Sequence, residues 1–209
     1  IFEDTSAFEL PYFLNLMAHL AERGVPSACP MADKSGCYLQ KIKGKPTAFV
    51  TRLAGSSVLL PTTKHCATIG TALARMHLAM ADFPERRPND RGVIWQKLTT
   101  DLISPKLTSQ DRVLLEQTLQ QQQSMAFDKL PMSVIHADLF RDNALFEGFE
   151  LSGIIDFYYA HDGPMIYDLA VTMIDWCYNE EGEFIDANAY ALINAYQKVR
   201  SISCNARSS

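Results

Sequence analysis

The sequence lacks any apolar run that approaches the roughly 20 residues needed to cross a bilayer. Its opening residues, IFEDTSAFEL, hold no basic stretch leading into an apolar one, so no secretory signal is visible. The five cysteines are scattered and include no C-x-x-C pair, which argues against a zinc site and a disulfide framework. These absences predict a cytoplasmic protein.

The sequence also lacks an excess of positive charge. It has 19 Lys and Arg against 24 Asp and Glu, a net charge of -5, and a pI of about 5.5. A nucleic-acid binder usually presents a basic face, so this balance argues against one. A nucleotide ligand stays compatible, because a local pocket can be cationic on an acidic protein.

The first part of the chain reads as one helix followed by two short strands. Ser6 and Glu9 have the spacing of a capping box, and apolar residues then recur at helical spacing up to Gly24, which ends the helix. The strands are expected at 38–42 and 47–53. The small residues 54–57 then form a break, which we interpret as a hinge between two lobes.

The remainder is mostly helical, with one embedded hairpin. Helices are predicted at 62–80, 108–127, 164–176 and 186–199, a strand at 132–136, and a hairpin over 144–157 that turns at Gly148. The stretch 83–92 is expected to be a surface loop and the tail 201–209 to be unstructured. This order predicts an α+β fold with a small mixed lobe at 1–53 and a mainly helical lobe at 54–209.

The most informative segment is HADLFRDNALF, followed shortly by SGIIDFYY. His136, Asp138 and Asn143 lie in one loop, and Asp156 follows on the next strand. Protein kinases carry the pattern H-R-D-x-x-x-x-N and a later D-F-G aspartate. Here the spacing from Asp to Asn is the same, Ala137 replaces the Arg, and Tyr158 replaces the Gly.

This pattern predicts phosphoryl transfer from a nucleotide to a hydroxyl. Asp138 would accept the proton of the attacking hydroxyl. Asn143 and Asp156 offer oxygen ligands of the kind that Mg²⁺ prefers. His136 is expected to hold the loop backbone rather than to act as a base. The alternative is a plain turn in which Asp138 and Asn143 cap backbone groups between two buried strands.

The motifs resemble those of the choline-kinase and aminoglycoside-phosphotransferase group, which has a protein-kinase-like, two-lobe fold. The segments ELPYFLNLMAHLAERGVP, FVTRLAGSSV, IGTALARMHLA and YDLAVTMIDWC are more narrowly similar to the bacterial homoserine kinases of that fold. The resemblance implies ATP-dependent phosphorylation of L-homoserine to O-phospho-L-homoserine, a step toward threonine, with Mg²⁺ as cofactor.

The resemblance also implies roles for individual residues. Asp138 is the catalytic base, and Asn143 and Asp156 are the Mg²⁺ ligands. Asp168 is a structural aspartate that holds the catalytic segment, together with His136. The backbone of Thr51, Arg52 and Leu53 is expected to meet the adenine of ATP.

The sequence departs from the family pattern at both ends. The phosphate-covering loop and the strand lysine would lie before Ile1, and the family continues past Ser209, so we expect a longer parent protein. Glu9 is the nearest candidate for the helical glutamate that pairs with that lysine. Ala137 and the short segment after Asp156 favour a small-molecule kinase without an activation-loop switch.

For several further side chains the sequence leaves two interpretations open. Arg141 is expected either to face a phosphate or a substrate carboxylate, or to be solvated. Tyr158 lines the acceptor pocket or packs. Asp162, beside His161, meets a substrate ammonium or only forms a turn. Arg86, Arg87 and Arg91 are expected to be a solvated cluster, and His77 a packed core histidine.

Two other functions stay open at this point. One is a kinase for another small alcohol or amine, such as choline, ethanolamine, methylthioribose or an aminoglycoside. The other is a non-catalytic remnant that binds a partner or nothing. The oligomeric state is not predictable from the sequence.

Overall fold

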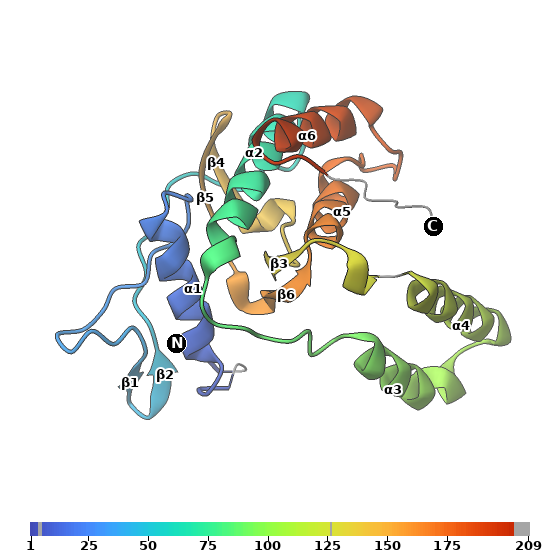
Figure 1. Ribbon diagram of the computed structural model, residues 1–209, viewed down its shortest axis with the longest axis horizontal. Coiled ribbons are helices and arrows are strands. Elements are labelled where there is room, and N and C mark those ends of the chain that lie inside the picture. The colour runs from blue at the N-terminus through green and yellow to red at the C-terminus, as the bar shows by residue number, and fades with distance from the viewer. Residues whose placement is uncertain (4–5, 126, 203–209) are drawn as a thin grey trace.

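The computed structural model describes residues 1–3, 6–125 and 127–202, and it has the α+β architecture that the sequence predicts (Figure 1). The described helices are α1 Leu10–Glu22, α2 Thr63–Ala79, α3 Val93–Ile103, α4 Ser109–Ser124, α5 Met165–Trp176 and α6 Asp186–Val199. The described strands are β1 Gln40–Ile42, β2 Lys45–Thr47, β3 Met132–Ile135, β4 Ala144–Glu147, β5 Glu150–Ile154 and β6 His161–Pro164. They pair antiparallel as β1–β2, β3–β6 and β4–β5.

Helix α1 buries the apolar face that its sequence spacing predicts, including Leu10 and Leu14, both fully buried. Gly24 ends it with φ of +71°, while the Val25 N–H donates to the Leu20 carbonyl at 3.0 Å. This closure satisfies carbonyls that the last turn leaves free. The predicted capping box was wrong, because the helix begins one residue after Glu9 and no side chain caps it.

Helices α2, α5 and α6 form the main helical layer, and α2 lies along α6 at the top of Figure 1. One face of α2 is buried, with Cys66, Ile69 and Leu73 at 0% exposure. The close crossing depends on Gly70, since a Cβ there would lie 2.2 Å from the Leu192 carbonyl oxygen. The observed bounds of α2, α4, α5 and α6 confirm the helices predicted at 62–80, 108–127, 164–176 and 186–199, with small shifts at their ends.

The predicted hairpin is formed by β4 and β5, and the segment before α2 is bonded to it. The Ser56 N–H donates to the Phe146 carbonyl at 3.1 Å, and the Phe146 N–H donates back at 2.9 Å. Gly55 allows this approach, because a Cβ there would lie 2.4 Å from the Phe146 oxygen. The stretch predicted as a hinge is thus paired to the hairpin, and the division between 1–53 and 54–209 stays a prediction.

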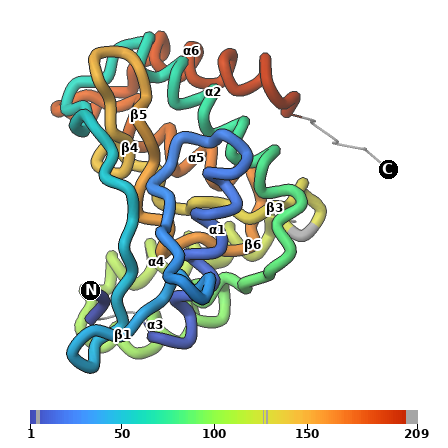
Figure 2. The backbone as a smooth tube through the Cα atoms, turned by 90° about the vertical axis from the view of Figure 1, so that its left-hand side faces the viewer, coloured from blue at the N-terminus to red at the C-terminus, as the bar shows by residue number. Residues whose placement is uncertain are grey.

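The N-terminal hairpin is shorter than the sequence predicts. Its second strand occupies 45–47 rather than 47–53, because Lys43 and Gly44 take positive φ and form the turn earlier. Beyond it the chain stays extended, and the Met31 N–H donates to the Phe49 carbonyl at 2.8 Å. Figure 2 shows this hairpin at the end of the molecule away from α2 and α6.

One other element differs from expectation. Strand β6 was missed, since HDGP contains Gly and Pro and no periodic pattern. On α5, Ile166 is 40% exposed, and the residue before it, Met165, is buried. The predicted unstructured tail lies largely outside the described residues.

Helix α3 was also missed by the sequence reading. It packs on α4, and the two helices lie apart from the main helical layer in Figure 1; we call residues 93–124 the α3–α4 arm. Much of its apolar surface is exposed, with Ile94 at 80%, Leu98 at 65% and Leu102 at 76%. No helix in the described part of the chain is both long and apolar enough to cross a membrane.

Candidate active site

The loop after β3 is held from below by Asp168, in the first turn of α5. Its carboxylate accepts hydrogen bonds from the His136 N–H at 2.9 Å and from the Ala137 N–H at 2.8 Å. Ala137 has φ of +66°, a left-handed conformation that a residue with a Cβ rarely adopts. The two bonds to one buried carboxylate stabilise this turn.

A buried chain of polar groups supports Asp168 in turn. His77 Nε2 lies 3.0 Å from the carboxylate, and His77 Nδ1 lies 2.8 Å from the Tyr196 hydroxyl. His77 is buried, as predicted for a core histidine, but its bonds to α5 and α6 were not foreseen. Burial alone would raise the pKa of Asp168; the bond from His77 and the nearby His136 outweigh it, so the pKa lies below its usual range.

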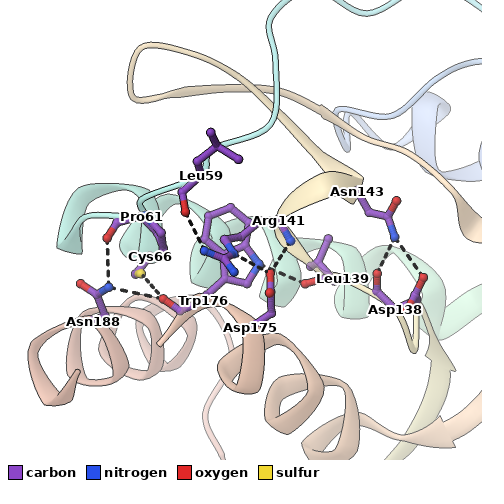
Figure 3. Close-up of polar contacts among 10 residues, drawn as sticks. All are labelled: Leu59, Pro61, Cys66, Asp138, Leu139, Arg141, Asn143, Asp175, Trp176 and Asn188. Carbon is purple, nitrogen blue, oxygen red and sulfur yellow. Dashed lines mark hydrogen bonds and ion pairs between the residues drawn. The ribbon is translucent and has the colours of Figure 1, made fainter. Parts of the chain in front are cut away.

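The rest of the loop is held by the last turn of α5. The Trp176 indole donates to the Leu139 carbonyl at 3.1 Å, and the Arg141 N–H donates to the Asp175 carboxylate at 2.6 Å (Figure 3). Asp168 and Asp175 are seven residues apart, so they share one face of the helix. A single face of α5 therefore fixes both halves of the loop.

The His136 ring lies inside the fold and bridges the loop to β5. Its Nδ1 accepts from the Asp138 N–H at 3.2 Å, and its Nε2 lies 3.0 Å from the Ile155 carbonyl. These partners assign the ring proton to Nε2. Both nitrogens are engaged, which supports a positioning role for His136 rather than a role as base.

Asp138 and Asn143 face each other across the loop (Figure 3). The Asn143 amide nitrogen donates to the Asp138 carbonyl at 2.8 Å and to its Oδ2 at 3.0 Å, while its amide oxygen points away. Burial raises the pKa of Asp138, nearby His136 and the Asn143 bond lower it, and Asp156 raises it; the net shift is upward. A raised pKa makes a carboxylate a better proton acceptor.

Asp156 follows β5 in the left-handed conformation, with φ of 62°. The bond from the Ile155 N–H to the Asn143 carbonyl, 3.0 Å long, joins its strand end to the loop. Its exposed carboxylate makes no hydrogen bond with the described residues. Together with the outward amide oxygen of Asn143, it gives two free oxygens, a donor set that fits a hard divalent cation.

Two neighbouring cavities open around these residues. The larger, about 500 Å³, has Asp138, Ala137 and Asp162 among its lining. The smaller, about 430 Å³, has Asp156 and Tyr158. Both are lined by Asp90, Arg91 and Tyr159, so Asp138 and the free carboxylate of Asp156 lie on two sides of a shared wall.

Of the three arginines predicted to be solvated, Arg86 and Arg91 are exposed, but Arg87 is not solvated. The Arg87 side chain is only 15% exposed and binds Glu9 at 2.9 Å and Asp90 at 2.8 Å. Its backbone N–H and carbonyl pair with Asp162 at 3.1 and 2.8 Å. The loop 83–92 is thereby tied to α1 and β6, and Glu9, the candidate partner of the strand lysine, pairs with Arg87 instead.

Of the remaining predicted site residues, two line one of the two cavities and Arg141 does not. Arg141 lines neither of these two cavities, and its guanidinium binds the Asp175 carboxylate at 3.0 Å and the Leu59 carbonyl at 2.6 Å. Asp162 does line the larger cavity, while also bonded to Arg86 at 3.3 Å. Tyr158 both packs on Phe13 and lines the smaller cavity.

The predicted adenine segment lies beside the hairpin. The Thr51 N–H donates to the Cys29 carbonyl at 2.9 Å, which holds the segment extended. Leu53 packs against Gly153 of β5, where a Cβ would meet its side chain at 2.5 Å. Within the described residues, the backbone of Arg52 and Leu53 makes no hydrogen bond.

Residues 1–202 match the phosphotransferase enzyme family, APH, which is almost the whole chain. The chain belongs to this family. Similar members named homoserine kinase come from Cupriavidus pinatubonensis, 45% identical over 97% of this chain, and Polaromonas naphthalenivorans, 42% identical over 99%. The chain spans 64% and 67% of the length of these two relatives.

Two solved structures of other phosphotransferases share the fold. The amicoumacin kinase hAmiN, in complex with AMP-PNP, Ca²⁺ and Ami, superposes with a TM-score of 0.71 at 14% identity, over 92% of this chain and 62% of that one. An aminoglycoside phosphotransferase from Alicyclobacillus acidocaldarius gives 0.67 at 17% identity, over 96% and 67%. The predicted protein-kinase-like fold is confirmed.

Proposed function

We propose that the protein containing this chain transfers the terminal phosphoryl group of ATP to the side-chain hydroxyl of L-homoserine. The observation that carries the proposal is the pairing of Asp138 with Asn143, beside a free Asp156, at the wall between two cavities. The choice of homoserine is supported by the relatives of that name, which are 41% to 45% identical to this chain.

Asp138 is the proposed base. The acceptor hydroxyl would lie in the larger cavity and give its proton to the Asp138 carboxylate as its oxygen bonds to the phosphorus. The bond between that phosphorus and the ADP oxygen breaks, and the products are ADP and O-phospho-L-homoserine. Asn143 orients the base through its bond to Oδ2, which leaves the other carboxylate oxygen for the hydroxyl.

Asn143 and Asp156 are the proposed holders of Mg²⁺. Their free oxygens fit the ion, which when bound neutralises charge on the nucleotide phosphates. No group of three or more His, Cys, Asp or Glu suited to a metal occurs in the described part of the chain. A cation here would thus depend on an amide oxygen, a carboxylate and water, as Mg²⁺ commonly does.

The nucleotide is proposed to lie on the side of residues 1–53, with its adenine at Thr51, Arg52 and Leu53, and the catalytic lobe to be 54–209. Two observations support this placement. The backbone of Arg52 and Leu53 makes no hydrogen bond with described residues, and Leu53 lies next to β5, which leads to Asp156. His136 and Asp168 are proposed to position the loop. The free thiols of Cys66 and Cys177 suit a reducing compartment, so we propose a cytoplasmic enzyme.

A coupled ADP-release assay on the full-length gene product tests the proposal. The acceptors are L-homoserine, choline, ethanolamine, methylthioribose and an aminoglycoside, each with ATP and Mg²⁺. We expect turnover with homoserine to exceed that with the other acceptors. Preferred turnover of another acceptor would reassign the substrate, and no turnover with any acceptor would reject the kinase function.

A further inference from the structure

The larger cavity is lined by one arginine, Arg91, that forms no ion pair with a described residue, although three carboxylates, those of Asp90, Asp138 and Asp162, line the same cavity. Arg91 is the one Lys or Arg among the described residues that line this cavity, and it also lines the smaller one. Its side chain forms no ion pair and no hydrogen bond with a described residue. By contrast, its neighbours Arg86 and Arg87 are paired with Asp162, Glu9 and Asp90.

Arg91 is exposed, but its backbone is held by two hydrogen bonds and its side chain contacts an aromatic ring. Its N–H donates to Asn89 Oδ1 at 2.9 Å, and its carbonyl accepts from the Gln96 side chain at 3.2 Å. Its guanidinium stands over the Tyr159 ring at 4.7 Å from the centroid. Stacking on a ring engages the flat face of a guanidinium and leaves its N–H edge free to bind.

A free and oriented guanidinium suits a carboxylate. The planar fork of N–H groups matches two carboxylate oxygens, and such charged hydrogen bonds are stronger than neutral ones. The same cavity holds Asp138, the proposed base for the hydroxyl. A ligand with a hydroxyl at one end and a carboxylate at the other would therefore meet both groups in one cavity.

We propose that Arg91 binds the α-carboxylate of the amino-acid acceptor and so selects acceptors that carry one. The inference rests on the proposed function and adds a specificity residue to it. The Arg87 contacts support it indirectly, since they hold the loop 83–92 against β6 and so place Arg91 at the cavity.

The test compares two fragments of homoserine as competitive inhibitors of the full-length enzyme. L-2-Aminobutyrate keeps the amine and carboxylate but lacks the hydroxyl, and 3-aminopropan-1-ol keeps the amine and hydroxyl but lacks the carboxylate. In Arg91→Ala we expect the inhibition constant of L-2-aminobutyrate to rise by about tenfold or more, and that of 3-aminopropan-1-ol to change by less than about twofold. Arg91→Lys should lie between wild type and Arg91→Ala.

Arg75→Ala is the matched control, because it removes an exposed guanidinium on α2 that makes no hydrogen bond with described residues. It should leave both inhibition constants unchanged. An unchanged constant for L-2-aminobutyrate in Arg91→Ala would overturn the inference. So would a rise in the KM for ATP alone, which would assign Arg91 to the nucleotide phosphates. A wild-type enzyme that does not phosphorylate homoserine would instead reject the proposed function.

Discussion

Helices α2 and α3 both carry apolar residues at helical spacing, but they end in opposite environments. On α2, Cys66, Ile69 and Leu73 are fully buried against α6 and the hairpin. On α3, Ile94 and Leu102 are 80% and 76% exposed. The spacing of apolar residues thus favours a helix, whereas burial requires a partner surface.

The difference extends to the polar groups. The loop after β3 is bonded to buried Asp168, to Trp176 and to the Ile155 N–H at the end of β5, and each bond fixes a backbone atom of the loop. The α3–α4 arm has few such attachments, and α4 buries no side chain among the described residues. We therefore expect substitutions in the loop and its support to have large effects and those in the arm to have small ones.

The largest effect is expected at the proposed base, Asp138. Asp138→Ala should lower kcat/KM for homoserine by about 10²- to 10⁴-fold, the usual contribution of a general base. ATP affinity by titration calorimetry and the thermal midpoint should stay close to wild type, because Asp138 does not support the fold. A variant with the wild-type rate would show that the base is assigned wrongly.

The support beneath the loop is expected to contribute most to stability. Asp168→Ala leaves His77 and two loop N–H groups without a buried partner, so the free energy of unfolding should fall by about 3–5 kcal/mol. Urea unfolding measures the loss. Asp101→Ala, an exposed change on α3, is the control and should stay within about 0.5 kcal/mol. Equal losses in the two variants would remove the contrast between loop and arm.

Asp156 is expected to affect the nucleotide rather than the fold. Asp156→Ala should weaken Mg²⁺-dependent nucleotide binding by at least about tenfold, since it removes a proposed ligand of the ion. Titration calorimetry with and without Mg²⁺ separates a loss of Mg²⁺-dependent nucleotide affinity from a loss of nucleotide affinity that does not depend on Mg²⁺. Unchanged affinity in the presence of Mg²⁺ would exclude Asp156 as a ligand.

A smaller effect is expected on the pH dependence of stability. The raised pKa of Asp138 means that the folded state keeps its proton to higher pH than the unfolded state does. The resulting stability is full below the unfolded-state pKa and is lost as pH rises through the folded-state pKa. Asp138→Asn stays neutral, so it should be more stable than wild type at pH 7 and lose this advantage in acid. Unfolding curves of both proteins at pH 7 and in acid measure the sign of this difference in stability.

The smallest effect is expected on the arm. Leu102→Ser should change the free energy of unfolding of the described chain by less than about 0.5 kcal/mol, because the side chain is already exposed. Leu73→Ala on α2 should cost about 2–5 kcal/mol, through lost burial and a cavity. A cost at Leu102 that approached the cost at Leu73 would show that the arm is covered in solution.

The elements that the sequence predicted well have strong local signals. Helix α2 has a long periodic face, and the loop has fixed spacing between Asp138 and Asn143. Strand β6 has no such signal, because its four residues become a strand only through pairing with β3. Helix α3 follows a loop rich in Pro and charge, and no side chain caps its first turn.

The site was predictable in its chemistry and less so in its supports. Arg87 reads as a loop cation, and its burial depends on Glu9 and Asp162, which are distant in sequence. His77 reads as a core residue, and its bond to Asp168 spans 91 positions. Arg141 lies within the motif yet pairs with Asp175 on the next helix. Each of these roles is set by long-range packing that one sequence does not display.

The most direct test of the central claim is ³¹P NMR of the reaction of the full-length protein with ATP, Mg²⁺ and L-homoserine. We predict one new phosphomonoester on the homoserine side chain for each ADP formed, and a loss of this signal in Asp138→Ala. Formation of ADP and inorganic phosphate without the phosphomonoester would contradict this prediction, as would an undiminished signal in the variant.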